Sequence, residues 1–452
     1  MTPVTHRARS RAGLNAAVAT LAAASIALTL TACGGSSDDL AREGNADDVA
    51  AALEEGGDLL VWAWEPTLEQ VVEDFEAEYP NVNVEMANVG TGNDHYVALQ
   101  NAISAGSGVP DVAQVEYGAL GQFTITDSLA DLTSFGAADL DGTFSPGPWG
   151  SVSEGDGIFG LPMDSGPMAL FYNAEVFEKY DVEVPTTWDE YVEAARALHA
   201  ADPNVYIGSD GNDPGFATSI MWQAGGKPYS VDGTDITIDL AGDEGAAKYA
   251  ETWQKLVDEG LVSDIQGWSD EWFQALGNGT LATLTTGAWM PANFESGAPE
   301  GSGKWRVAPM PQWEAGANAT AENGGSSLAV TEASEKEALA YGFLEYATAG
   351  DGVQARLDGG AFPATTADLE SDEFQSKEFE YFGGQKVNEV LSDSATHVVE
   401  GWQNLPFQVY ANSIFPDTVG QAFIGSGTIT DGLKAWQDAS VKYAQDQGFT
   451  IK

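Results

Sequence analysis

The chain has 452 residues, of which 69 are Asp or Glu and 18 are Lys or Arg, so its formal net charge is −51. Such a surface repels phosphate backbones, which excludes nucleic acid as a main partner, and it disfavours an anionic substrate unless a local basic pocket escapes the average. Hydrophobic residues make up 43%, which excludes disorder over most of the length, and about 150 residues per domain allows two large domains or three smaller ones.

The first 32 residues have the composition of a secretory signal. Arg7, Arg9 and Arg11 precede an Ala- and Leu-rich run over 14–30, and no Asp or Glu occurs before Cys33. The run is close to the lower length limit for a membrane span and is rich in Ala, so a permanent transmembrane helix is the weaker interpretation. We therefore expect residues 1–32 to be removed during export.

Cys33 is the single cysteine of the chain, so it cannot form an internal disulfide. It ends the string Leu30-Thr31-Ala32-Cys33, which resembles the bacterial lipobox, and the resemblance implies that Cys33 is lipidated and becomes the first mature residue. The polar, Ala-rich residues 33–57 suit a flexible tether, with the folded part beginning near Asp58. No second apolar run of about 18 residues occurs, so the lipid anchor is the only membrane contact we expect.

Short apolar runs alternate with amphipathic stretches from residue 59 onward. The runs over 59–64, 82–86 and 111–115 predict strands, and the apolar spacing over 68–79 and 96–103 predicts helices between them. This alternation implies right-handed crossovers and a parallel sheet. Ligands bind beyond the carboxyl ends of such strands, a rule that points to the four residues Trp64, Glu65, Glu116 and Tyr117.

The pattern continues beyond the length of one domain. Thr187, with Glu190 three residues later, predicts the start of a helix that runs to His199, and a second helical stripe covers 249–257. Trp188 and Trp253 lie on these stripes and are expected in the core. Further strands are predicted over 281–286 and at 329–330, so two α/β lobes are the partition that the pattern favours.

Several strings recur in a specific order along the chain. Residues 160–180, GLPMDSGPMALFYNAEVFEKY, are followed by PTTWDE at 185–190. The other strings are YPNV at 79–82, AGSGVPDV at 105–112, GG at 225–226, GAW at 287–289, PMP at 309–311 and GAFPA at 360–364. Together they resemble the family 1 extracellular solute-binding proteins, the sugar receptors of bacterial ABC importers.

The resemblance implies an α/β, two-lobed periplasmic-binding-protein-like fold of type II, with parallel and mixed sheets flanked by helices and a cleft and hinge between the lobes. Lobe 1 would comprise residues 58–163 and 324–358, and lobe 2 residues 164–323 and 359–452. Gly and Pro at these crossings can absorb the backbone rotation of a hinge. Ordinary loop punctuation explains them equally well from composition alone.

A sugar offers flat C–H faces, which suit aromatic planes, and hydroxyl groups, which need donors and acceptors. Trp64, Trp289 and Trp402 are the first candidates for stacking, followed by Trp222 and Trp268, with core packing as the alternative for each. The resemblance supports Trp289, in its Gly-Ala-Trp turn, and Trp402, which follows the last crossing.

Carboxylates are the strongest candidates for binding the hydroxyls, because a charged acceptor forms the stronger hydrogen bond. The family places such groups at strand ends and at the hinge, which implies roles for Glu65, Glu116 and Asp164. Asn93 and the backbone N–H groups of Gly324 and Gly325 are further candidates.

Other chemistries find less support. The chain has no Gly-x-Ser-x-Gly string, and His residues 6, 95, 199 and 397 are far apart, so we expect no nucleophilic catalysis, zinc site or cofactor. Residues 139–142 and 210–213 resemble the start of calcium loops without the full ligand series. A phosphorylated ligand is disfavoured because few Lys and Arg residues are expected in the cleft. Lys227 and Arg356 could bind a phosphate, so this alternative is not excluded.

The sequence thus predicts an exported, monomeric, non-enzymatic receptor, lipid-anchored at the outer face of the cytoplasmic membrane. It would capture a neutral di- or oligosaccharide and present it to an ABC permease. Two alternatives stay open: a surface-anchored glycan hydrolase, since acid pairs beside aromatic residues also serve that chemistry, and a receptor for a non-sugar solute or a macromolecule.

Overall fold

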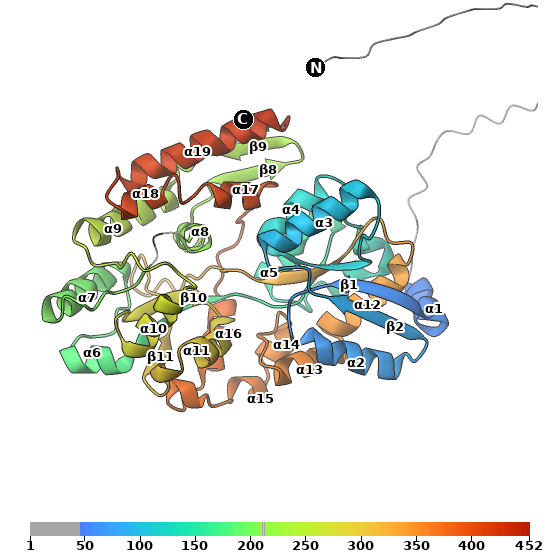
Figure 1. Ribbon diagram of the computed structural model, residues 1–452, viewed down its shortest axis with the longest axis horizontal. Coiled ribbons are helices and arrows are strands. Elements are labelled where there is room, and N and C mark those ends of the chain that lie inside the picture. Colours follow the sequence, from blue (N-terminus) through green and yellow to red (C-terminus); the bar gives the residue numbers. More distant parts are fainter. Residues whose placement is uncertain (1–45, 210, 212) are drawn as a thin grey trace, which may run out of the picture. The chain divides into compact units, whose positions relative to one another are not determined.

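The computed structural model describes residues 46–209, 211 and 213–452 (Figure 1). The predicted signal, Cys33 and two residues of the calcium-like string at 210–213 lie outside the described residues. Of the helices described, none combines the length and the apolar character needed to cross a membrane.

The part that we call lobe 1 is built on a five-stranded sheet in the order β2-β1-β3-β12-β6. Its strands are β1 Gly57–Trp62, β2 Val82–Ala87, β3 Val112–Glu116, β6 Leu161–Pro162 and β12 Ser326–Val330. β1 pairs in parallel with both β2 and β3, as the strand–helix alternation predicts. β12 joins from a distant part of the chain and runs antiparallel to β3, with Ser326 opposite Glu116.

The helices of lobe 1 bury the apolar stripes that their spacing predicts. On α2, the side chains of Leu68, Val71 and Phe75 are fully buried against the sheet. α3 ends at Gly106, whose left-handed φ of 61° suits a residue without a Cβ. The lobe 1 helices are α1 Ala46–Glu55, α2 Leu68–Glu78, α3 Asn93–Ala105, α4 Tyr117–Thr124, α5 Pro146–Val152, α12 Glu337–Ala349 and α13 Gly352–Asp358, with 3-10 turns at Leu132–Phe135 and Ala137–Leu140 and a small hairpin of β4 Ser153–Glu154 and β5 Gly157–Ile158.

The predicted tether over 33–57 is wrong in its last part. Residues Ala46–Glu55 form helix α1, and the side chain of Val49 is buried in the lobe 1 core. Leu53, one turn further along the same face, packs beside Gly342 of α12. The Ala-rich composition that suggested a flexible linker is equally that of a short amphipathic helix, and the fold supplies the apolar surface that decides between them.

Lobe 2 contains two three-stranded sheets, in the orders β10-β7-β11 and β13-β9-β8. Its strands are β7 Met168–Asn173, β8 Tyr229–Asp232, β9 Asp235–Ile238, β10 Thr283–Gly287, β11 Trp305–Ala308 and β13 Thr450–Ile451. Its helices are α6 Ala174–Tyr180, α7 Trp188–Ala201, α8 Pro214–Gln223, α9 Glu244–Asp258, α10 Asp270–Asn278, α11 Met290–Gly297, α15 Asp372–Gln375, α16 Val387–Ala395, α17 Gln408–Ser413, α18 Gly420–Phe423 and α19 Ile429–Asp446, with 3-10 turns at Pro299–Gly301 and Glu380–Phe382.

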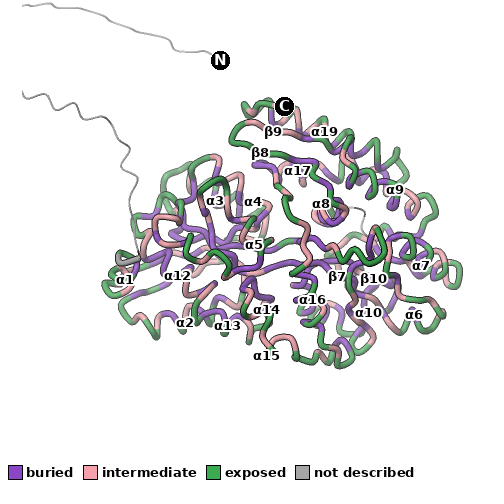
Figure 2. Tube along the Cα trace, turned by 180° about the vertical axis from the view of Figure 1, so that it is seen from behind, coloured by how far each residue is buried: buried purple, intermediate pink, exposed green. Residues whose placement is uncertain are grey.

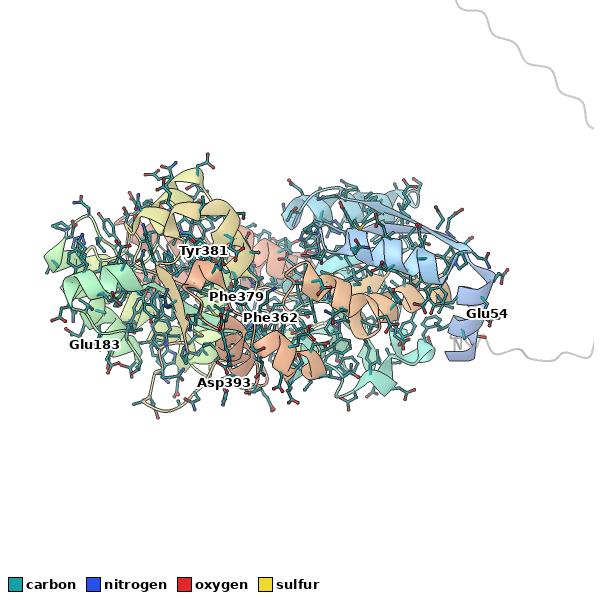
Figure 3. All side chains as sticks on the ribbon, turned by 90° about the horizontal axis from the view of Figure 1, so that it is seen from below. Glu54, Glu183, Phe362, Phe379, Tyr381 and Asp393 are labelled. Atoms are coloured by element: carbon teal, nitrogen blue, oxygen red, sulfur yellow. The ribbon has the colours of Figure 1, made fainter. Side chains whose placement is uncertain are left out.

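The predicted start and buried face of α7 are confirmed. Thr187 and Glu190 form a capping box, in which each side chain binds the backbone N–H of the other residue. Trp188 and Trp253 are 1% and 0% exposed, so both belong to the core as expected. Buried residues run through the central strands in Figure 2, while exposed residues line the outer helices. A further apolar cluster includes Phe171 of β7 together with Phe362 and Tyr381, and Phe379 packs against it. Figure 3 labels the last three residues.

Two antiparallel segments connect the lobes. Residues 163–168 run beside residues 321–326, with Met163 N–H donating to Ser326 O and Asn323 N–H donating to Gly166 O. Further along the chain, α14 comprises Thr366–Leu369. Before this helix, Ala364 O accepts a hydrogen bond from Ser145 N–H of lobe 1, at 2.8 Å.

Candidate functional site

The carboxyl ends of β1 and β3 meet at one edge of the lobe 1 sheet, as the parallel pairing requires. Trp64 and Glu65 follow β1, and Glu116 and Tyr117 lie at the end of β3. The buried Gln114 joins the two groups, because its Oε1 accepts the backbone N–H of Trp64 at 3.0 Å and that of Glu65 at 3.1 Å. The four residues that the sheet rule predicts therefore gather at one edge.

An aromatic group supports this edge. The indole of Trp64 lies edge-on to the buried His95, with ring centroids 4.9 Å apart, and Tyr96 lies 6.3 Å from Trp64. Burial lowers the pKa of His95 to about 4, so the imidazole is neutral at neutral pH. The hydroxyl of Tyr96 donates to Glu116 Oε2 at 2.7 Å, which orients the carboxylate. Burial nevertheless raises the pKa of Glu116.

A cavity opens beside Glu116, between α4 of lobe 1 and α8 and α17 of lobe 2. Its atom-free space is about 790 Å³, a figure that includes space open to solvent. Lobe 1 contributes Tyr96, Glu116, Tyr117, the first turn of α4 and Ser151 of α5. A ligand in this cavity would therefore contact both lobes.

Helix α8 forms part of the lobe 2 wall. Gly215, Thr218, Ser219 and Trp222 line the cavity at helical spacings of i, i+3, i+4 and i+7, so one face of the helix is presented to it. Asp213 caps the N-terminus, its Oδ1 accepting the N–H of Phe216 at 2.9 Å. This face combines two hydroxyl groups with one aromatic plane.

Trp222 and Trp402 form a stacked pair beside the cavity. Their ring centroids are 5.4 Å apart and their planes differ by 9°. The indole N–H of Trp222 donates to Val399 O at 2.5 Å, and that of Trp402 donates to Asn404 Oδ1 at 3.1 Å. Tyr229 meets Trp402 edge-on at 5.8 Å. Both residues line the cavity, and these contacts hold their indoles in place.

Three residues of the segment 322–325 line the cavity: Glu322, Gly324 and Gly325. Gly324 and Gly325 have φ values of +76° and +97°, a region that favours glycine. A Cβ on Gly325 would lie 2.5 Å from the ring of Tyr117, whose backbone N–H donates to Gly325 O at 3.1 Å. Burial raises the pKa of the carboxyl group of Glu322 to about 7.

Trp289 and Trp268 form a second stacked pair, with centroids 5.6 Å apart. The indole N–H of Trp289 donates to Asn323 O at 2.7 Å, within the segment 322–325. Trp268 is 55% exposed and has a φ of +66°, which is an unusual backbone conformation for a bulky residue. Neither indole lines the cavity.

The predicted site residues fall into two groups. Glu116, Tyr117, Trp222, Gly324, Gly325 and Trp402 line the cavity. The others lie outside its lining: Trp64 and Glu65 at the sheet edge, Asp164 at the first crossing, Trp268 and Trp289 beside the second crossing, and Asn93 exposed at the start of α3. Which of these residues touches a ligand stays a prediction.

Several lining residues were not predicted from the sequence, among them Tyr96, Glu322, Asn404, Gln408 and Asn412. The helical spacing of Thr218, Ser219 and Trp222 could have indicated that one face of α8 lines the cavity. Gln408 and Asn412 are also one turn apart and hydrogen-bonded to each other at 2.8 Å. Nothing local to the sequence distinguishes Glu322 from other acidic residues. Among the described residues, no group of three or more His, Cys, Asp or Glu side chains is placed to hold a metal ion.

The chain is similar to known proteins in sequence. The model of the family described as "Bacterial extracellular solute-binding protein" matches residues 63–354. The chain is 26% identical over 360 residues to the lactose-binding protein of Rhizobium radiobacter, covering 75% of this chain and 82% of that protein.

Two solved structures resemble the protein over most of its length. The ABC transporter associated binding protein from B. animalis subsp. lactis Bl-04, in complex with β-1,6-galactobiose, has 46% identity and a TM-score of 0.79, covering 87% of this chain and 99% of that one. The galacto-N-biose/lacto-N-biose I-binding protein from Bifidobacterium longum, in complex with lacto-N-biose, has 25% identity and a TM-score of 0.74, covering 88% and 99%.

Proposed function

The chain belongs to the bacterial extracellular solute-binding proteins, and from this premise we propose that it captures a neutral di- or oligosaccharide and delivers it to the permease of an ABC importer. The observation that carries the proposal is a cavity lined by both lobes that places the Trp222–Trp402 pair together with Glu116. Aromatic planes suit the C–H faces of a sugar, and a carboxylate accepts its hydroxyl groups.

The relatives support a narrower ligand class. The structure with 46% identity holds β-1,6-galactobiose, and a curated relative is a lactose-binding protein. Both sugars are disaccharides that contain a β-linked galactose, so we propose a β-galactoside as the ligand and β-1,6-galactobiose as the first compound to test. The scarcity of cations around the cavity argues against a phosphorylated sugar.

Closure of the lobes would accompany binding. A ligand that contacts α4 of lobe 1 and α8 of lobe 2 together makes its full set of contacts only when the lobes are close, so it shifts the population toward the closed state. We propose lobe boundaries at residues 163/164, 323/324 and 358/359, the first two of which lie in the paired crossings, with a third crossing around Gly359 to Pro363. Hinge rotation would be absorbed at the glycines of the second crossing.

The family is extracellular, so the protein acts outside the cytoplasm. We propose that Cys33 anchors it through a lipid to the outer face of the cytoplasmic membrane and that it works as a monomer. We also propose that it binds its sugar without altering it, in keeping with a family of binding proteins.

A thermal-shift assay with product analysis tests this function. The mature chain carrying Cys33→Ala would be heated with β-1,6-galactobiose, lactose, galactose and an unrelated disaccharide, and each sugar would be recovered afterwards. A ligand present at 1,000 times its Kd stabilises a protein by about 4 kcal/mol, so we expect a clear rise in Tm with β-galactosides recovered intact. Cleaved sugar would make the protein a glycan hydrolase, and no shift with any sugar would indicate a different solute.

A further inference from the structure

The two paired crossings exchange hydrogen bonds through one carboxylate each. Asp164 of the first crossing accepts the backbone N–H of Ser326 of the second at 2.5 Å. Glu322 of the second crossing accepts the backbone N–H of Gly166 of the first at 2.6 Å. Each segment therefore holds the other through an acidic side chain, by a bond that is charge-assisted when that side chain is ionised. Any hinge rotation between 164 and 326 acts on these two side chains.

The positively charged side chain near this pair is Arg356, and it interacts with Asp164. Arg356 of α13 is 2% exposed, and its Nη1 donates to Met163 O, while Nε and Nη2 have no hydrogen-bond partner. Its charge faces Asp164, Glu65 and Tyr117 and lowers the pKa of Asp164, although burial outweighs it and raises that pKa to about 7. Glu65 and Glu116 are the other charged groups that face Asp164.

Glu322 has no such cation. Burial is the main cause of its raised pKa, and the charged group that faces it is Asp164, which raises the pKa further. The titratable hydroxyl of Tyr117 on α4 also faces Glu322. The other elements packed against Glu322 meet it with uncharged residues: a Cβ on Gly147 of α5 would lie 3.0 Å from Oε1, and Ser219 of α8 donates to the backbone oxygen at 2.7 Å. The ionised form of Glu322 therefore lacks a nearby positive partner among the described residues.

The carboxylate of Glu322 can accept more hydrogen bonds than it receives from the protein. Its donors are Gly166 N–H and the hydroxyl of Ser165, which lies 3.1 Å from Oε1 and 3.3 Å from Oε2. A carboxylate has about four lone-pair sites, so roughly two remain free. Because Glu322 lines the cavity, a ligand bound there lies beside the residue that carries these sites.

We propose that Glu322 accepts hydrogen bonds from the hydroxyl groups of the bound sugar, that sugar binding thereby drives its proton to solvent, and that its bond to Gly166 transmits this change to the hinge. The inference rests on the proposed sugar-binding function and adds one ligand-contacting residue and a pH dependence to it. Hydroxyl donors stabilise the ionised carboxylate in place of the missing cation, so the affinity for sugar rises with pH until Glu322 is ionised without ligand.

Isothermal titration calorimetry of the mature chain with β-1,6-galactobiose tests the proposal. Titrations at pH 6.5 in two buffers with different ionisation enthalpies give the number of protons released per sugar bound. Because the pKa of Glu322 is about 7, the group is mostly protonated at pH 6.5, and we expect release of roughly half a proton or more. At pH 8.5 the release should disappear and the affinity should be several-fold higher.

Three variants test whether the proton released on sugar binding comes from Glu322. Glu322→Gln should abolish the buffer dependence and weaken binding about tenfold at pH 8.5. Asp164→Asn removes a group whose ionised form raises the pKa of Glu322, so it should lower the pH at which the proton release disappears. Glu345→Gln is the matched control, because burial raises the pKa of Glu345 on α12 as well and this residue does not line the cavity; it should titrate like the wild type.

The outcomes separate the two proposals. Absence of heat with every sugar would overturn the proposed function. Binding of galactobiose with equal heats in both buffers, or proton uptake in place of release, would leave the receptor intact and overturn this inference. The wild-type titration decides the point even if Glu322→Gln fails to fold, and unchanged proton release in a folded Glu322→Gln protein would assign the effect to another group.

Discussion

The indole of Trp402 lies parallel to that of Trp222, with their centroids 5.4 Å apart and their planes differing by 9°. Trp222 comes from α8, and Trp402 comes from the loop before α17, 180 positions later in the chain. Hydrogen bonds from both indole N–H groups, together with the ring of Tyr229, hold the pair at the edge of the cavity. A preformed aromatic wall of this kind loses little conformational freedom when a sugar ring packs against it.

Removal of this wall should weaken sugar binding. We expect Trp402→Ala to raise the Kd for β-1,6-galactobiose at least tenfold, because the substitution removes a stacking surface and frees Trp222, and tenfold corresponds to about 1.4 kcal/mol. Calorimetry measures the effect. Trp313→Ala is the control, since Trp313 is partly buried in lobe 2 and does not line the cavity. Equal affinities for wild type and Trp402→Ala would remove Trp402 from the site.

Gly325 should not tolerate a side chain. Its φ is +97°, and a Cβ there would lie 2.5 Å from the ring of Tyr117, so Gly325→Ala combines backbone strain of about 1–3 kcal/mol with a steric clash. Gly316→Ala is the control. Gly316 has a similar φ of +80°, but no atom lies within 4 Å of an added Cβ, so this substitution introduces the backbone strain without the steric clash. We expect urea unfolding to show the larger loss of stability for Gly325→Ala. A loss no greater than that of the control would mean that Tyr117 moves freely.

The stability of the sugar-free protein should fall as pH rises from about 4 to about 7. Burial raises the pKa of Asp164 and of Glu322 to about 7 from ordinary values of 3.8 and 4.5. In this window the unfolded chain has released protons that the folded chain still holds, so the free energy of unfolding decreases with pH. The double variant Asp164→Asn, Glu322→Gln should show a flatter profile of urea midpoint against pH. Parallel profiles would contradict the raised pKa values.

The proposed anchor predicts a change of location. Replacement of the single cysteine by Cys33→Ala should release the protein from the membrane fraction into the medium, because no thiol remains for a lipid. Immunoblotting of membranes and medium measures the distribution. Retention of the variant on membranes would show that another contact holds the protein there.

Local sequence patterns predicted the elements around the site. The periodicity of Leu68, Val71 and Phe75 predicted α2, the alternation of Val82 and Val84 predicted β2, and the capping pair of Thr187 and Glu190 predicted the start of α7. The parallel pairing of β1 and β3 then followed from connection rules, so the gathering of Trp64, Glu65, Glu116 and Tyr117 at one sheet edge was predictable without a structure.

The sequence by itself therefore determined the class of fold, the strand ends that face a ligand and the kind of residue that a sugar requires. Only the tertiary structure decided which acidic and aromatic residues share one cavity. Glu322 is one of 69 acidic residues and gains its raised pKa from burial beside Asp164, which is 158 positions away in the chain. Periodicity reports the face of a single helix or strand, whereas desolvation and charge proximity depend on every segment that packs around a group.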